Sequence, residues 1–180
     1  MGNCVSGCNS QSQSADQSAD QSAEDSLNSS SDDFAGIKNT ELWLHTTPFV
    51  APITKGRVIK VYDGDTITIA AKLPRTANSP LYRFSVRLNG IDTPELKTKN
   101  EVEKKVALFA RDALAGKILY RDVYLKEVKT EKYGRLLAEV WLENECLNDW
   151  MITQRFAVEY DGGTKKSPDN WEEYHNGIKN

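Results

Sequence analysis

The fold of this chain is decided by FSVRLNGIDTPE, residues 84–95. Apolar and polar residues alternate over the first six positions, which predicts a β-strand with one apolar face. Arg87 lies on the opposite face, where a ligand can reach it. The strand then enters an acidic turn, because Pro94 forces Thr93 out of helical geometry. The stretch therefore joins a buried strand to a group of charged side chains.

Two further motifs, DGDT at residues 63–66 and KYGR at residues 132–135, extend this group. The three motifs supply two aspartates, two arginines and one glutamate, namely Asp65, Asp92, Arg87, Arg135 and Glu95. Aspartate oxygens are ligands for a hard cation such as calcium, and an arginine can fork onto two phosphate oxygens. With one further carboxylate, this set is what metal-assisted attack of water on phosphorus requires.

Each motif alone also has a purely structural explanation. Residues 63–65 read Asp-Gly-Asp, a common hairpin turn, and residues 92–94 also read as a turn. Arg87 fits a solvated strand residue, and Arg135 fits a residue that follows a Lys-Tyr-Gly turn. Taken jointly, these explanations leave the number and type of the charged residues unaccounted for.

The chain resembles the staphylococcal-nuclease-like family, the calcium-dependent thermonucleases. The resemblance lies in three motifs in the family's order, namely D-G-D-T, R-x4-D-T-P-E and K-Y-G-R. The resemblance runs from about Arg57 to Tyr160, more than half of the chain. It implies a calcium-dependent nuclease, a hydrolase that cuts phosphodiester bonds of DNA, RNA or both and leaves 3′-phosphates. The alternative is a catalytically silent nucleic-acid-binding or scaffold module on the same fold. Because the chain keeps all five charged residues, the enzyme is favoured.

The resemblance also implies how calcium is held. Asp65 and Asp92 bind it through their side chains, and Thr93 binds it through its backbone carbonyl. Glu95 orients or deprotonates the attacking water. An all-oxygen ligand set suits calcium better than zinc. Both histidines of the chain lie outside the motifs, so a zinc site is not expected.

The remaining implied roles concern the substrate, which is a nucleic acid. Arg87 and Arg135 are the catalytic cations that hold the scissile phosphate and stabilise its transition state. Lys132 and Tyr133 lie beside a nucleotide phosphate. Tyr160 either stacks on a base or packs against the domain, and the sequence leaves both readings open. No protein partner is indicated, and a monomer is expected.

The wider pattern predicts an α+β fold. Strand signatures recur at residues 66–69, 84–89, 123–125 and 136–142. These short strands, interrupted by a helix, suit a five-stranded Greek-key barrel of the OB type with two or three helices. The strands follow from the pattern, whereas the barrel is implied by the resemblance.

Helical spacing appears in two places. The first helix is predicted by a set of apolar residues, namely Val102, Val106, Phe109, Ala110 and Ala113. Gly116 can end that helix. Leu147, Trp150 and Met151 predict a second, shorter helix, with the thiol of Cys146 buried at its start. The chain departs from the family at Arg155, where glycine is usual, and in a C-terminal helix that is shortened.

The N-terminus, Met-Gly-Asn-Cys-Val-Ser, fits the N-myristoylation pattern, with Gly2 exposed after removal of methionine and serine at position six. One myristoyl chain binds membranes only marginally, so a second signal is needed. No lysine or arginine precedes Lys38, but Cys4 and Cys8 can be palmitoylated. We expect a lipid-anchored protein on the cytoplasmic face of a membrane in a eukaryotic host, with the plasma membrane as one candidate. Without acylation, for example if the match is accidental, the expected location is the cytoplasm.

The chain divides by composition into four segments. They are an acylation motif at residues 1–8, a tether at 9–33, an apolar-containing lead-in at 34–54 and the nuclease-like domain at 55–180. The tether repeats Gln-Ser-Ala-Asp and is expected to be disordered, because it can bury little apolar surface. The lead-in either packs on the domain or lies against a membrane.

The net charge of −3 conceals a division between the two halves. Residues 1–54 hold seven acidic residues and one basic residue, a charge of −6, so the remainder holds 22 basic and 19 acidic residues, a charge of +3. A mildly basic domain suits a polyanionic substrate. No apolar h-region of a secretory signal occurs in residues 1–33, no run approaches a membrane span, and three cysteines do not indicate a disulfide framework.

Overall fold

The structure, a computed structural model, describes residues 38, 41–131 and 133–178, which form two units divided between Thr47 and Pro48. The first unit contains a single described element, the 3-10 helix η1 (Leu42–His45), in which Trp43 and Leu44 are exposed. The acylation motif and the tether lie outside the described residues. Within the described part, no helix has the length and apolar character needed to span a bilayer.

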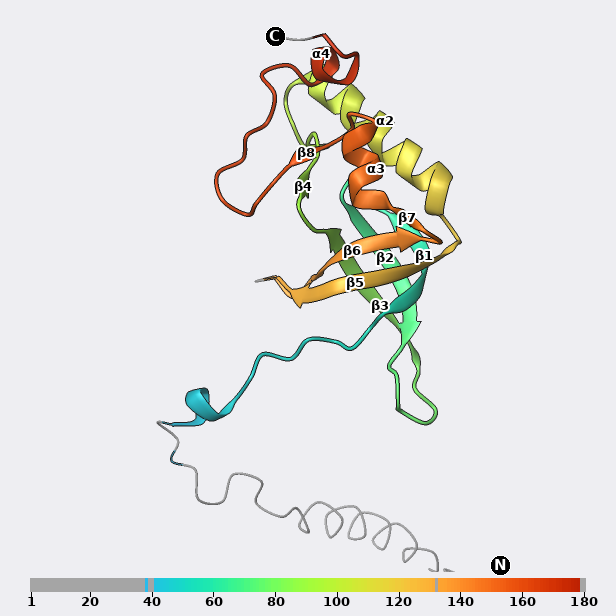
Figure 1. The fold of residues 1–180 in the computed structure, drawn as a ribbon, viewed down its shortest axis with the longest axis vertical. Coiled ribbons are helices and arrows are strands. Elements are labelled where there is room, and N and C mark those ends of the chain that lie inside the picture. Colours follow the sequence, from blue (N-terminus) through green and yellow to red (C-terminus); the bar gives the residue numbers. More distant parts are fainter. Residues whose placement is uncertain (1–37, 39–40, 132, 179–180) are drawn as a thin grey trace, which may run out of the picture. The chain divides into compact units, whose positions relative to one another are not determined.

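The second unit is built around antiparallel strands. Its long strands are β1 (Lys55–Val61), β2 (Thr66–Lys72), β3 (Leu81–Leu88), β5 (Asp122–Thr130) and β6 (Leu136–Leu142). Short strands are β4 (Ile91–Asp92), β7 (Glu145–Cys146) and β8 (Val158–Glu159). The helices are α2 (Glu101–Ile118), α3 (Leu147–Thr153) and α4 (Trp171–His175), and Figure 1 shows them together at one end of the sheet.

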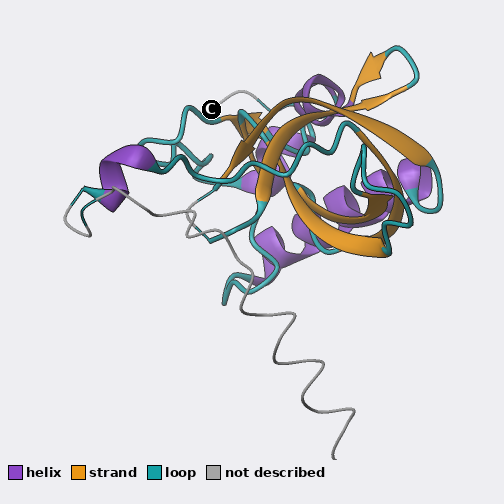
Figure 2. Ribbon diagram, turned by 90° about the horizontal axis from the view of Figure 1, so that it is seen from below, coloured by secondary structure: helices purple, strands orange, loops and turns teal. Residues whose placement is uncertain are grey.

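The sheet closes into a five-stranded barrel. Its strand order is β3-β2-β1-β5-β6-β7, and β3 also pairs in parallel with β6. The strands curve around a common interior, which Figure 2 shows from one end. The predicted α+β fold, an OB-like five-stranded barrel with helices, is therefore confirmed.

Alternation along the strands explains the core. On β6, every second residue is buried, namely Leu136, Ala138, Val140 and Leu142. Val86 and Leu88 are buried on β3, as the alternating pattern predicts. The lead-in contributes too, since Ala51 and Ile53 are buried in the same core. Burial of these side chains stabilises the barrel by about 1.5–3 kcal/mol for each large aliphatic group.

Helix α2 differs from the expectation in its end and in its buried face. It begins at the cap residue Asn100, whose side chain accepts hydrogen bonds from two backbone N–H groups, and it runs past Gly116 to Ile118. The prediction that Gly116 ends it is wrong, because Leu114 and Ile118 extend the apolar stripe and their burial outweighs the low helix propensity of glycine. Val102 and Phe109, which we expected in the stripe, are exposed.

The other helices agree with the sequence. Leu147 and Met151 of α3 are buried. The prediction that the Cys146 thiol is buried is wrong, because Cys146 lies on β7 at the edge of the sheet and is only half-buried; this partial burial still raises the pKa of the thiol. Helix α4 is short and buries Trp171. Between them, Arg155 adopts a φ of 56°, a backbone conformation that glycine adopts at least cost. This explains why glycine suits the position and shows that arginine is strained there.

Asn148 on α3 ties the helix to the barrel. Its amide accepts a hydrogen bond from the Val140 N–H at 2.9 Å and donates to the carbonyl oxygens of Asn89, at 2.7 Å, and Ala138, at 3.4 Å. Asn148 is 4% exposed, so water does not replace these bonds easily.

We expect Asn148→Ala to lower the free energy of unfolding by about 2–4 kcal/mol, because it leaves buried backbone groups unpaired. Denaturant titration followed by circular dichroism measures the loss. The matched control is Asp149→Ala on the same helix, where the side chain is exposed and the change should stay below about 1 kcal/mol. Equal losses in the two variants would contradict the role given to Asn148.

Candidate functional site

Strand register brings the three motifs to one end of the barrel. Arg87 on β3 lies opposite Thr66 on β2 and opposite Leu137 on β6. Asp65 immediately precedes Thr66, and the Leu88 N–H donates to the Asp65 carbonyl at 2.8 Å. Arg135 immediately precedes β6 on the other side. The closure of the barrel therefore places an aspartate and two arginines around β3.

These side chains line one cleft of about 910 Å³. The predicted site residues on its wall are Asp65, Arg87, Thr93, Glu95, Tyr133, Arg135 and Tyr160. Asp92 lies just below the wall, with 3% of its side chain exposed. Lys132, predicted to contact substrate, and the lipidation residues Gly2, Cys4 and Cys8 lie outside the described residues. All the other predicted site residues thus lie in or beneath a single cavity.

The Arg87 guanidinium is the centre of the cleft floor. Its Nη1 pairs with Asp65 Oδ2, and its Nη2 lies 3.7 Å from Asp92 Oδ1 and donates to the Ile91 carbonyl at 3.1 Å. The three side chains are 14%, 7% and 3% exposed. One cation therefore holds two buried carboxylates close together, and each would be costly to bury alone.

The turn before β2 is both a hairpin turn and part of the site. Gly64 is required there by space, since a Cβ would lie 3.0 Å from Thr93 Cγ2 and 3.2 Å from Ala110 Cβ. The absence of a side chain lets the turn approach the acidic segment and helix α2. Asp65 is then held by the Thr66 hydroxyl, which donates to its Oδ1 at 2.9 Å.

Asp63 is a member of the cleft that the sequence did not single out. Its Oδ1 accepts a hydrogen bond from the Asp65 N–H at 3.2 Å, and the residue lines the cavity. Burial, followed by the negative charge of Asp65, raises the pKa of Asp63 to about 6. The signal available in the sequence was the Asp-x-Asp spacing, which reads equally as turn chemistry.

Arg135 lies at the other side of the cleft and is held by Glu131. The pair is bidentate, with Arg135 Nε 2.6 Å from Glu131 Oε2 and Nη2 2.9 Å from Oε1. The hydrogen bonds to Glu131 raise the pKa of Arg135 against the effect of desolvation. Arg135 is 32% exposed, so its guanidinium is fixed in orientation yet accessible to a ligand.

The acidic segment is held from the C-terminal side. Strand β4 pairs with β8, where Asp92 lies opposite Val158, and the Tyr160 N–H donates to the Gly90 carbonyl at 2.9 Å. Gly90, with φ of 77°, turns the chain from β3 into β4. Glu95 follows at the mouth of the cleft with 61% of its side chain exposed.

Lys165 is the second residue that sequence reasoning missed. Its ammonium lies 2.9 Å from Asp92 Oδ1 and 2.7 Å from Glu95 Oε1, although it belongs to the loop between β8 and α4. Desolvation lowers its pKa, but hydrogen bonds to Glu95 and Asp92 raise it more, so it stays charged. The sequence indicated only a basic pair after a Gly-Gly turn.

The donor atoms fit a hard divalent cation. Two buried carboxylates held by one arginine, with the Thr93 backbone beside them, form an all-oxygen set of the kind calcium prefers. Across the described residues, no group of three or more histidine, cysteine, aspartate or glutamate side chains is arranged as a metal centre.

Comparison with known proteins gives a consistent result. The family described as staphylococcal nuclease homologue matches residues 85–177, just over half of the chain. The chain is similar to protein ParB of Escherichia coli (38% identical over 92 residues, 51% of this chain and 44% of that protein). It is also similar to a thermonuclease of Staphylococcus hyicus (35% over 103 residues, 56% of each). A probable endonuclease of Schizosaccharomyces pombe matches at 33% over 86 residues, 44% of this chain and 37% of that protein. The chain thus spans about half the length of these relatives.

We expect Arg87→Met to lower the free energy of unfolding by about 3–5 kcal/mol, because it leaves two buried carboxylates without their shared partner. Arg135→Met is the matched control and should lower it by about 1 kcal/mol or less, since that pair is partly exposed. Urea unfolding at neutral pH gives both values. A small loss for Arg87→Met would show that the buried pairs are not what holds β2, β3 and β4 together.

Proposed function

The chain belongs to the family of staphylococcal nuclease homologues, and on that premise we propose that it hydrolyses phosphodiester bonds of DNA, RNA or both in a calcium-dependent reaction. The observation that carries the proposal is the single cleft in which Arg87 and Arg135 face a group of carboxylates. Two guanidinium groups that line one cavity are suited to bind the oxygens of one phosphate group.

The two arginines differ in burial, and this suggests different roles in binding the phosphate. Arg87 is nearly buried and fixed by two aspartates, so it presents a preorganised positive charge to a phosphate. Arg135 is turned into the cleft by Glu131 and can approach the same phosphate from the β6 side. Tyr133 and Tyr160 also line the cavity, where aromatic rings can contact a nucleotide.

Asp65, Asp92 and the Thr93 carbonyl are the groups that would hold calcium. When bound, calcium supplies a Lewis acid that offsets negative charge on the phosphate. The family resemblance assigns it, and the hard, buried oxygen set supports the assignment. Arg87 keeps these carboxylates together and limits the charge repulsion between them.

Glu95 is the group that accepts a proton from the attacking water. It is the most exposed carboxylate of the set and lies on the cleft wall, so a water molecule can reach it. Its backbone N–H donates to Glu103 Oε1 at 3.1 Å, which fixes the segment on helix α2. Attack on phosphorus and departure of the 5′-oxygen leave the 3′-phosphate product implied by the resemblance.

The alternative function is a module that binds nucleic acid without cutting it. The two functions share the cleft with its two arginines and differ in the need for Glu95. The presence of the glutamate on the wall of the cleft that both arginines line favours the enzyme. A binding module would hold an oligonucleotide for hours with calcium and release it uncut.

We expect the purified chain to cut labelled DNA or RNA with calcium and not with excess chelator. Glu95→Gln should lower the turnover by about 10²-fold or more while the affinity for oligonucleotide stays within a few-fold. Arg135→Lys should also lower turnover strongly, since lysine cannot reproduce the planar fork.

Gel analysis of end-labelled products measures the rate, and fluorescence anisotropy measures binding. Unchanged cleavage in chelator would remove calcium from the mechanism. Normal turnover of Glu95→Gln would show that another group handles the water. Tight binding with no cleavage under any condition would establish the silent module instead.

We further propose that lipids on Gly2 and on Cys4 or Cys8 tether the domain to the cytoplasmic face of a membrane. The motif supports this, and so does the lack of lysine and arginine before Lys38, which leaves palmitate as the available second signal. The acidic, repetitive stretch that follows would act as a flexible spacer.

We expect the full chain, expressed in eukaryotic cells, to sediment with membranes and Gly2→Ala to move to the soluble fraction. Cys4→Ser combined with Cys8→Ser should leave weak, reversible attachment, because one acyl chain holds only marginally. Fractionation with mass spectrometry of the N-terminal peptide tests both. A soluble protein with an unmodified N-terminus would refute the tether and leave the nuclease proposal intact.

A further inference from the structure

The loop between β8 and α4 crosses the acidic side of the cleft. Both side-chain oxygens of Asp92 are engaged by this loop, with Oδ1 at 2.9 Å from Lys165 Nζ and Oδ2 at 3.3 Å from the Ser167 hydroxyl. The same ammonium lies 2.7 Å from Glu95 Oε1. One lysine therefore bridges the carboxylate proposed to bind calcium and the carboxylate proposed to take the proton.

The charges in the cleft explain why the lysine is held there. Asp65, Asp92 and Glu95 are three acids at this side of the cleft, with Asp63 next to Asp65, and Arg87 pairs with the first two. The Lys165 ammonium adds a second positive charge at hydrogen-bonding distance from two of the three acids. A divalent cation bound to Asp92 would repel this ammonium strongly at such short range.

The loop is built so that it can be released. Its first part is a Gly162-Gly163 turn, in which Gly162 has φ of 90°. Two local hydrogen bonds shape it, from the Tyr160 hydroxyl to the Gly163 carbonyl at 3.1 Å and from the Gly163 N–H to Asp161 Oδ1 at 2.9 Å. Lys165 is 46% exposed, so its side chain can leave the carboxylates for water without passing through the core.

We propose that Lys165 is a displaceable internal cation, which competes with calcium for Asp92 and keeps Glu95 engaged until calcium binds. Binding of calcium to the aspartates and release of the loop are then one coupled event. The competition lowers the apparent calcium affinity, because binding must first break two ion pairs. This inference rests on the proposed function and adds a residue outside the three motifs to its control.

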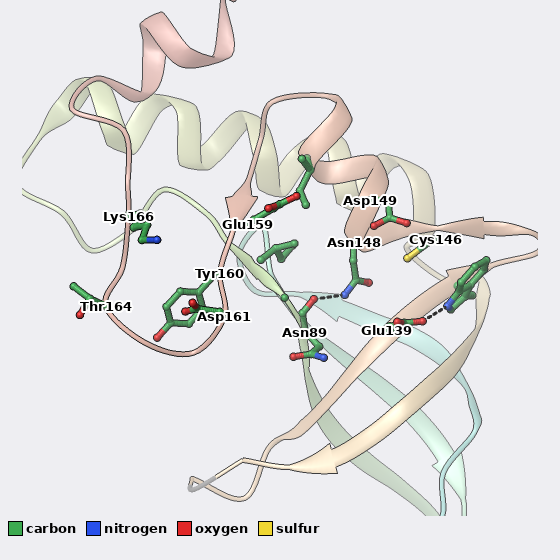
Figure 3. Close-up of a pocket in the computed structure, with 14 residues that line it drawn as sticks. Asn89, Glu139, Cys146, Asn148, Asp149, Glu159, Tyr160, Asp161, Thr164 and Lys166 are labelled. Atoms are coloured by element: carbon green, nitrogen blue, oxygen red, sulfur yellow. Dashed lines mark hydrogen bonds between the residues drawn. The ribbon is translucent and has the colours of Figure 1, made fainter. Parts of the chain in front are cut away.

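The neighbouring lysine provides a matched control. Lys166 carries the same charge on the same loop but lines a different cavity of about 560 Å³ on the α3 side, together with Asn148, Tyr160 and Asp161. Figure 3 shows this cavity, with Lys166 and Thr164 on the loop and Asn148 bonded to Asn89. Substitution of either lysine removes one positive charge from the loop, but only Lys165 touches the proposed calcium ligand.

The test measures calcium binding by isothermal titration calorimetry on the full chain without substrate. Lys165→Met, which removes the charge but keeps a long unbranched side chain, should tighten calcium binding by roughly 5- to 150-fold, the usual range for coupled sites. Lys166→Met should leave the affinity within about twofold. Hydrogen exchange of residues 161–167 should speed up when calcium is added to the unmodified protein, as the loop is released.

The outcomes separate the two proposals. If the unmodified chain binds calcium and Lys165→Met binds it no more tightly, the displaceable cation is wrong and the proposed function stands. If Lys165→Met and Lys166→Met tighten calcium binding equally, the effect comes from the general loss of positive charge, and the displaceable cation is again wrong. If none of the proteins binds calcium, both the calcium dependence and this inference fall together.

Discussion

The buried contact of Arg87 with Asp65 and Asp92 is the interaction on which the rest of this structure depends. It joins the turn before β2, the C-terminal end of β3 and the short strand β4. A buried charge is tolerated only when its partners are close, so these three segments must meet for any of them to be buried. The barrel itself is closed by the pairing of β3 with β6, and Arg87, near the end of β3, lines the cleft beside that pairing. The Arg87 side chain belongs to both the fold and the cleft, so a change at this residue affects both.

Much of this arrangement could be predicted because it is encoded locally. Alternation of apolar residues gave the strands and showed which face of β3 carries Arg87, since period-two patterning depends only on immediate neighbours. The charged residues of the three motifs were identified by type, and the structure brings the described ones to one cavity. The helix that contains Leu147 and Met151 was found for the same reason, since both residues lie on one apolar face.

What could not be predicted depends on contacts distant in sequence. Val102 and Phe109 were wrongly assigned to the buried face of α2, because the apolar character of a residue does not show which side of the helix packs against the barrel. Lys165 is 70 residues from Glu95 in the sequence, and the pairing of β8 with β4 brings the two together. Strands of two residues are too short to leave an alternating pattern in the sequence, so this pairing could not be predicted. Asp63 was not predicted as a cleft residue, because an aspartate two positions before Asp65 is equally typical of a turn. Asp63 and Lys165 thus line the cleft from segments that the local pattern describes as ordinary loop.

The pairing of β4 with β8 also has a consequence for how the protein is made. Ribosomes build chains from the N-terminus, so Asp92 and Glu95 emerge well before the segment that holds them in place. Until Tyr160 has emerged, the Gly90 carbonyl lacks this partner, and the acidic segment has nothing to order it from that side. The barrel strands can pair earlier, but the cleft is completed late in translation. The acidic side of the cleft is thus the last part of it to take its final form.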